Sequence, residues 1–174
     1  MAKLILVFIA LLAVSCGPLS GASGATSRPA DLFSFTSDPS DAVGSGQSKS
    51  FAPPNAKFVV EPGTAPDYVQ LVVERGGDYW SIDIAAPIGH ALAVGTYDNA
   101  GELSARTDTT PILMVYGEGR ACGRSTGSFT ITQIAFDQQD RLVALQATFV
   151  QRCVAPDAGA FRGTLAYGQP ATAG

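Results

Sequence analysis

The stretch 68–86 decides the fold of this chain and reads YVQLVVERGGDYWSIDIAA. Apolar residues recur at every second position on each side of Gly76-Gly77, which is the spacing of β-strands that bury one face. A Gly-Gly pair supplies the positive φ angles that a two-residue hairpin turn needs. The stretch therefore predicts two antiparallel strands joined by a tight turn.

The position of the turn also sets the register of the two strands. With Gly76-Gly77 at the turn, Arg75 faces Asp78, and a slip of one residue would move every side chain to the other face. The inward pairs are then all apolar: Val73–Trp80, Leu71–Ile82 and Val69–Ile84. Trp80 is predicted in the core and Tyr79 on the surface, as an ordinary cross-strand aromatic or as a ring that stacks on a sugar.

A second strand pair is predicted over 127–136 (GSFTITQIAF) and 142–153 (LVALQATFVQRC), joined by DQQDR. The apolar residues of the first strand change parity between Ile131 and Ile134, which a regular strand cannot do without an extra residue. We therefore predict a bulge near Thr132-Gln133, or else a strand buried on both faces. On the second strand, one parity forms the predicted core face: Val143, Leu145, Ala147, Phe149 and Cys153.

Weaker strand signals lie over 32–36, 49–52, 56–61, 112–116 and 160–167. Turn-rich pieces separate them, in keeping with 19 glycines and 11 prolines. Short strands without intervening helices predict one all-β domain over residues 31–168. We expect an antiparallel sandwich, or an open barrel, of about 8–9 short strands.

The N-terminus, residues 1–15, reads MAKLILVFIALLAVS and has the parts of an export signal: Lys3, an apolar run and a small-residue exit. The apolar run is well short of the roughly 20 residues that span a bilayer as a helix. Residues 16–30 are rich in Gly, Ser, Ala and Pro and are predicted to be a flexible tether. Residues 169–174 are predicted to be a disordered tail.

The three cysteines divide into a pair and a remainder. An exported chain enters an oxidising compartment, where disulfides persist. Cys122 and Cys153 both lie inside the predicted domain, so the economical partition is a Cys122–Cys153 bridge with Cys16 left over.

Two fates are open to Cys16. The sequence LLAVSC fits an ordinary signal-peptidase site after Ser15, and it also resembles the lipobox of bacterial lipoproteins, which ends in a cysteine. The short signal, the missing disulfide partner and the flexible segment that follows favour lipidation. We therefore predict that Cys16 carries acyl chains such as palmitate and anchors the domain to the cell membrane or outer membrane, facing the periplasm or the exterior.

The charge balance excludes one class of partner. The chain has 11 Lys and Arg, 15 Asp and Glu, and a net charge of −4. An acidic chain without a Lys/Arg run lacks the electrostatic footprint of a nucleic-acid binder. We expect no nucleic-acid partner.

Several short motifs occur in an order that resembles an uncharacterised family of exported bacterial β-sandwich domains. In sequence order they are SDPSDAVGSGQS, WSIDIAAP, GTY, GEGRACG, TGSF, FVQRC and GAFRG. The family pattern has a Gly-Arg-x-Cys turn and a second Cys near the end, so the resemblance implies a β fold and a disulfide rather than a reaction. Members often have His before the second Cys and Asn after the first, where this chain has Arg152 and Gly123. Arg152 argues against a histidine chemistry here.

Few residues point to chemistry. His90, the single histidine, is predicted in a surface loop without a nucleophile nearby, and it offers no second imidazole for zinc. Asp38 and Asp41 in SDPSD are either calcium ligands or, as we prefer, side chains that stabilise a turn. Asp137 and Asp140 are interpreted as turn residues. We predict no catalytic residue, no metal and no cofactor.

Three arginines, Arg120, Arg124 and Arg152, lie within two residues of Cys122 or Cys153, so the bridge would gather them. Guanidinium groups bind carboxylate and phosphate bidentately, which makes an anion site one hypothesis. The hypothesis we favour is pairing with Glu118 and other local carboxylates on a solvated rim.

These observations predict a non-enzymatic binding or interaction module of the bacterial envelope, held at the membrane through Cys16. Its expected partner is an envelope protein or a glycan. The alternative is a binder of anions or glycans, or an enzyme, that uses Arg120, Arg124 and Arg152.

Overall fold

The computed structural model describes residues 31–154 and 158–168. The predicted signal peptide, Cys16, the tether and the C-terminal tail lie outside these residues. The regular secondary structure of the described part of the chain is β-strand, apart from one short 3-10 turn, η1 (Leu103–Ala105). The strands are β1 (Leu32–Ser37), β2 (Ser48–Phe51), β3 (Lys57–Val60), β4 (Tyr68–Arg75), β5 (Asp78–Ala85), β6 (Gly95–Gly101), β7 (Ile112–Gly117), β8 (Ser125–Phe136), β9 (Leu142–Cys153) and β10 (Ala160–Gly168). The predicted all-β fold is confirmed.

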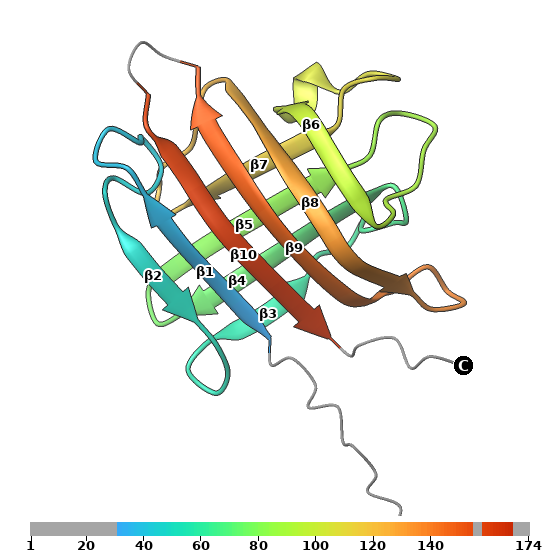
Figure 1. The fold of residues 1–174 in the computed structure, drawn as a ribbon. Helices are drawn as coiled ribbons and strands as arrows, with labels where there is room; N and C mark the ends of the chain where they lie inside the picture. The colour runs from blue at the N-terminus through green and yellow to red at the C-terminus, as the bar shows by residue number, and fades with distance from the viewer. Residues whose placement is uncertain (1–30, 155–157, 169–174) are drawn as a thin grey trace, which may run out of the picture.

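All ten strands belong to one sheet, in the order β2-β1-β10-β9-β8-β6-β7-β5-β4-β3. The sheet curls into a half-barrel, so that β1, β10, β9 and β8 form one layer and β7, β5, β4 and β3 cross behind it (Figure 1). Of the two predicted architectures, the open barrel is therefore the one that forms. The sheet is mixed rather than fully antiparallel, because β6 and β7 pair in parallel at Gly101 and Ile112.

The sequence reasoning missed one strand, β6. Its sequence, GTYDNAG, lacks the alternation of apolar and polar residues that indicates a half-buried strand. The pairing of β6 with β8 is also irregular, with a register shift between Tyr97 and Ala100, and Asn99 has a φ of 55°. Pairing with its neighbours, rather than a local pattern, makes this segment a strand.

The β4–β5 hairpin has the predicted register at every pair, from Arg75–Asp78 at the turn to Val69–Ile84. Gly76 takes a φ of 59° at the turn, a value that favours glycine. Trp80 is 0% exposed and Tyr79 is 43% exposed, as predicted. The alternation of the sequence thus fixes which side of this hairpin meets the core.

The β8–β9 pair contains the predicted bulge, because the register shifts between Ile131 and Gln133. A second shift, between Ala135 and Phe136, leaves Val143 without a partner opposite it. Val143 is 38% exposed, so its predicted place on the core face is wrong. The second bulge moves Val143 out of the alternation that the rest of β9 follows.

Aromatic rings fill the core between the two layers. Phe35 stacks on Phe161 and packs against Trp80, with ring centroids 4.5 Å apart in both pairs. Gly163 on β10 leaves room for the ring of Phe149 on β9, since a Cβ at this glycine would lie 2.2 Å from Phe149 Cζ. The layer that contains β1, β9 and β10 therefore rests on a closely packed aromatic support.

Two side-chain junctions hold the layers together. At one, the fully buried side chain of Gln151 on β9 receives a hydrogen bond from Val115 N (2.7 Å) and donates to Val115 O (2.9 Å) on β7. Beside it lies the predicted disulfide Cys122–Cys153, whose Cα atoms are 5.1 Å apart. On the side of β7 away from β5, Val115 has no partner among the described strands. The side-chain amide of Gln151 makes the two hydrogen bonds that a strand would make there.

At the other junction, charged side chains join the edge strand β2 to the β4–β5 turn. Arg75 donates to Ser50 O at 2.9 Å and lies over the ring of Phe51, 4.1 Å from its centroid. Lys49 pairs with Asp78 at 3.3 Å and also with Glu118. These contacts cover a sheet edge that would otherwise offer unpaired backbone groups.

Candidate functional site

A row of hydroxyl side chains crosses six adjacent strands on the outer surface of the half-barrel. Its members are Ser50 on β2, Ser34 on β1, Thr164 on β10, Thr148 on β9, Thr130 on β8 and Thr96 on β6. Each is the register partner of the next. We call the outer surface of these six strands the hydroxyl face.

The row arises because strand residues alternate between the two surfaces of a sheet. In β1 the sequence LFSFTS buries Phe33 and Phe35 and turns Ser34 and Thr36 outward. The same alternation in β2, β8, β9 and β10 places an aromatic residue beneath and a hydroxyl above. The aromatic core is therefore also the floor of the hydroxyl face.

A second row lies one outward position further along the strands. It consists of Ser48, Thr36, Arg162, Val150 and Ser128. Neighbouring strands lie about 4.8 Å apart, and alternate residues on one strand about 7 Å apart. The hydroxyls of Ser48, Thr36 and Ser128 thus add further donors and acceptors beside the first row.

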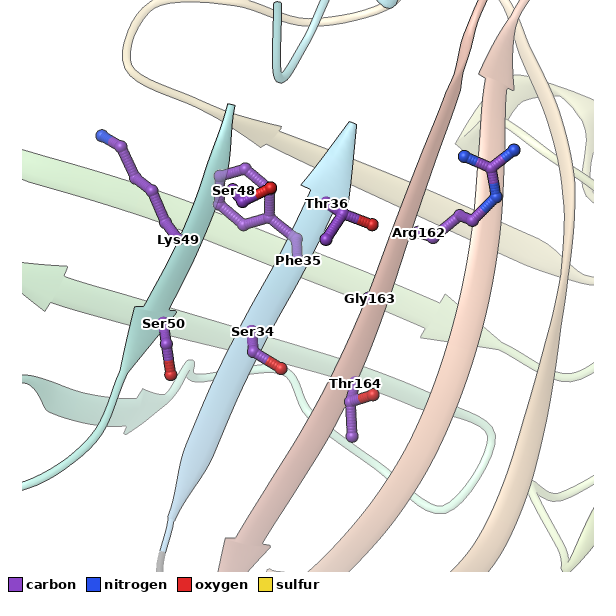
Figure 2. A pocket seen from close by; sticks show the side chains of 9 residues that line it. All are labelled: Ser34, Phe35, Thr36, Ser48, Lys49, Ser50, Arg162, Gly163 and Thr164. Atoms are coloured by element: carbon purple, nitrogen blue, oxygen red, sulfur yellow. The ribbon is translucent and has the colours of Figure 1, made fainter. Parts of the chain in front are cut away.

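The hydroxyl face is hollowed at two places. The larger hollow has a volume of about 500 Å³ and lies over β2, β1 and β10. Figure 2 shows Ser50, Ser34 and Thr164 side by side on these strands, with the ring of Phe35 on the other side of the sheet. The smaller hollow, of about 160 Å³, is lined by Ser128, Thr130, Thr148 and Val150. The first row passes through both hollows.

The two cations that line the larger hollow, Arg162 and Lys49, are both paired with carboxylates. Arg162 forms an ion pair with Asp38 at 2.8 Å, and Ala160 N donates to the same carboxylate. The hydrogen bonds from Arg162 and Ala160 hold the pKa of Asp38 below its ordinary value. Lys49 lines the larger hollow, but its ammonium group is paired with Asp78 and Glu118. The larger hollow therefore suits an uncharged, hydrogen-bonding ligand.

The hydroxyl groups themselves are available for binding. Among the described residues, one hydrogen bond joins members of the first row, between Thr96 and Thr130 at 3.0 Å. Ser50, Thr148 and Thr164 are exposed. A hydroxyl both donates and accepts hydrogen bonds, which is the chemistry that a polyhydroxylated ligand requires.

The outer surface of the crossing layer has a different character. There β4, β5 and β7 place a polar cluster around Asp83, which is 6% exposed although it faces outward. Burial raises the pKa of Asp83 to about 6, and hydrogen bonds from Ser81, Gln70 and Tyr68 lower it in part. We call this group, with Tyr116, the Asp83 cluster.

The three arginines near the disulfide have different partners. Arg120 donates to Val43 O and pairs with Glu118 at 3.0 Å, as the favoured hypothesis predicts. Arg124 is exposed, and its charge acts on Glu102. Arg152 is exposed and donates to Ala158 O at 3.4 Å. Anion binding by the three stays a prediction that this arrangement does not favour.

The other candidate residues have structural surroundings. Asp41 accepts a hydrogen bond from Gly44 N at 2.5 Å, which is the contact of a turn-stabilising side chain. Asp137 accepts from the backbone N–H groups of Gln139 and Arg141 in the β8–β9 turn. His90 is exposed in the loop that follows β5. Within the described residues, no three His, Cys, Asp or Glu side chains come together as a metal site.

Sequence reasoning did not find the hydroxyl face or the buried Asp83. The alternation in FSFTS, SFTIT and SKSF was visible, but the alignment of these segments depends on long-range strand order. Comparisons with protein families, with curated proteins and with solved structures give no match for this chain. In the described ranges, no helix has the length and apolarity to cross a membrane.

Proposed function

We propose that this protein is an exported, lipid-anchored module of the bacterial envelope that binds an uncharged glycan on the hydroxyl face. The module holds its ligand and carries out no reaction. Glycans present hydroxyl groups at short intervals, and a row of Ser and Thr hydroxyls complements them as donors and acceptors.

The observation that carries the proposal is the row of six hydroxyl residues in register across six strands. The row lies over an aromatic core, and its side chains have few rotatable bonds, so binding orders little that is not already ordered. The two cations that line the larger hollow are paired: Arg162 with Asp38, and Lys49 with Asp78 and Glu118. The preference for an uncharged ligand follows from this pairing.

The anchoring part of the proposal rests on the sequence of residues 1–30 and agrees with the position of β1. Leu32 begins β1 opposite Ala166, close to where β10 ends. A tether attached at Leu32 would therefore leave the domain at one end of the hydroxyl face. The second row lies further along β1 than the first row, so it would be farther from the membrane.

The test of binding uses the mature chain with Cys16→Ser, which removes the lipid site. Maltohexaose, cellohexaose and N-acetylchitohexaose serve as uncharged probes in a calorimetric titration. We expect at least one of them to bind, and Thr148→Val with Thr164→Val to weaken that binding about tenfold, since two hydrogen bonds are lost. Thr109→Val, in an exposed loop, is the matched control and should bind normally.

A further variant separates this proposal from its alternative. Arg120→Ala with Arg152→Ala leaves the hydroxyl row intact, so glycan binding should be unchanged. Loss of binding in this variant, with normal binding by the double valine variant, would assign the site to the arginines instead.

The test of anchoring is fractionation of cells that express the full chain. The natural sequence should be found with the membranes, and Cys16→Ser should be released from them. Equal membrane association of both proteins would contradict lipidation at Cys16.

A further inference from the structure

Asp83 lies on the outer surface of the sheet but is enclosed by its neighbours. It is opposite Gln70 on β4 and Met114 on β7, and both side chains are half-buried. Tyr68 and Tyr116, on the same two strands, are also half-buried. The carboxylate therefore lies beneath its neighbours, which include two phenol side chains.

The hydrogen bonds around this carboxylate come from neutral groups. Ser81 Oγ donates to Asp83 Oδ1 at 3.0 Å. The side-chain amide of Gln70 donates to Ser81 Oγ and to the Tyr116 hydroxyl, each at 3.3 Å. Tyr68 adds a further hydrogen bond to the carboxylate. These contacts orient the carboxylate without neutralising its charge.

Asp83 differs in this respect from the carboxylates that form ion pairs, in which an Arg or Lys compensates the acid: Asp38 with Arg162, Asp67 with Arg106, Asp78 with Arg75, Glu118 with Lys49 and Asp137 with Arg141. In the described part of the chain, Asp41 is also buried without a cation, but its carboxylate accepts a hydrogen bond from the backbone of Gly44 in a turn. Within the residues that the structure describes, no Lys, Arg or His forms an ion pair with Asp83. A buried carboxylate without a cation is costly to fold, which marks the position as one where a ligand would repay the cost.

We propose that the Asp83 cluster binds a small primary ammonium group. The carboxylate supplies the opposite charge, the hydroxyl oxygens of Ser81 and Tyr116 accept hydrogen bonds, and the phenol rings attract a cation through their faces. Tyr79, on the same surface of β5, is a further phenol and is exposed. This site is separate from the hydroxyl face and does not depend on the glycan proposal.

Two sources of the ammonium group are distinguished by the choice of probe. Glucosamine carries a primary ammonium on a sugar, and 1,4-diaminobutane carries it on an alkyl chain, whereas N-acetylglucosamine keeps the sugar and loses the charge. Each is titrated into the mature Cys16→Ser chain at pH 7.5 while the NMR signals of β5 and β7 are followed. We expect an ammonium-bearing probe to bind and N-acetylglucosamine not to bind.

The decisive variant is Asp83→Asn, which keeps the shape of the side chain and removes its charge. We expect it to weaken binding of the ammonium probe at least tenfold. Asp98→Asn, at an exposed carboxylate on β6, is the matched control and should bind normally. Unchanged binding in Asp83→Asn, equal binding of glucosamine and N-acetylglucosamine, or no response to any ammonium probe would each overturn the proposal.

The unmodified chain gives a second test that does not depend on the folding of a variant. The titratable groups that face Asp83 are Tyr68 on β4, Tyr79 on β5 and Tyr116 on β7. Burial raises the pKa of Tyr68 to about 12 and the pKa of Tyr79 above its ordinary value. Binding should therefore weaken as the pH falls from 7.5 to 5, because Asp83 takes up a proton. An affinity that does not change over this range would contradict a role for the carboxylate.

Discussion

The two layers of the half-barrel bury the same kind of side chain and expose different kinds. On the inside, Phe35 from one layer packs against Trp80 from the other. On the outside, the hydroxyl face presents a row of short, uncharged groups beside the ion pair of Arg162 with Asp38, whereas the Asp83 cluster encloses a carboxylate that has no cation. One rule of alternation produces both inner surfaces, so the two layers differ chiefly in the side chains on their outer surfaces.

The two outer surfaces are also formed in different ways. The hydroxyl face is assembled by strand register: each residue is ordinary, and only the alignment of six strands makes a row. The Asp83 cluster is assembled by enclosure, because neighbours on two strands cover one unusual residue. We expect the first site to tolerate single substitutions and the second to depend on one side chain.

The largest effect on stability should come from a substitution at Gln151, in the junction that joins the two layers. Gln151→Leu keeps the volume of the side chain but leaves Val115 N and Val115 O buried without partners. We expect a loss of about 4 kcal/mol in the free energy of unfolding, since each unsatisfied group costs about 1–3 kcal/mol. Chemical denaturation measures this loss. A stability within 1 kcal/mol of the natural chain (roughly the worth of one hydrogen bond) would show that Gln151 does not hold the layers together.

A smaller effect on stability should come from the Asp83 cluster, and this effect should depend on pH. Burial raises the pKa of Asp83 from 3.8 to about 6, so the folded state keeps a proton that the unfolded state releases between these values. Stability therefore falls as the pH rises from about 4 to about 6, by at most about 3 kcal/mol.

The difference between the natural chain and Asp83→Asn isolates this contribution, because Asp38, Asp78 and Asp137 have lowered pKa values and act with the opposite sign in both proteins. Urea denaturation at pH 4 and pH 7 should show the natural chain losing stability relative to Asp83→Asn as the pH rises. Parallel pH profiles for the two proteins would mean that the carboxylate is not held in a costly position.

The smallest effect on stability should follow from substitutions on the hydroxyl face. Thr148→Val and Thr164→Val exchange one β-branched side chain for another on an exposed surface, so the unfolding free energy should change by less than about 1 kcal/mol. The binding of an uncharged oligosaccharide should nevertheless weaken. A double variant that is strongly destabilised would indicate that these hydroxyls serve the fold rather than a ligand.

The sequence predicts the local features of this fold better than the long-range ones. The β4–β5 register and the bulge after Ile131 were predictable, because a Gly-Gly turn and a change of parity are written in adjacent residues. The exposure of Val143 was not, since it depends on a second bulge that leaves no clear trace in the order of apolar residues. Strand β6 was missed for a related reason: its neighbours, rather than its own sequence, make it a strand.

The sites follow the same division. Pairing of Cys122 with Cys153 followed from counting cysteines, and pairing of Arg120 with Glu118 followed from their proximity in the chain. The hydroxyl row requires knowing that β10 lies between β1 and β9, which local patterns do not contain. Asp83 was assigned to an outward position, and its burial depends on side chains from β4 and β7 that lie over it.

The measurement that tests the central claim most directly is an NMR titration of the mature Cys16→Ser chain with the uncharged oligosaccharide that binds best. We predict that the backbone signals of Ser34, Thr148 and Thr164 shift together, and that those of Tyr79 and Asp83 on the crossing layer do not. Shifts confined to Arg120 and Arg152, or to the Asp83 cluster, would contradict the assignment of glycan binding to the hydroxyl face.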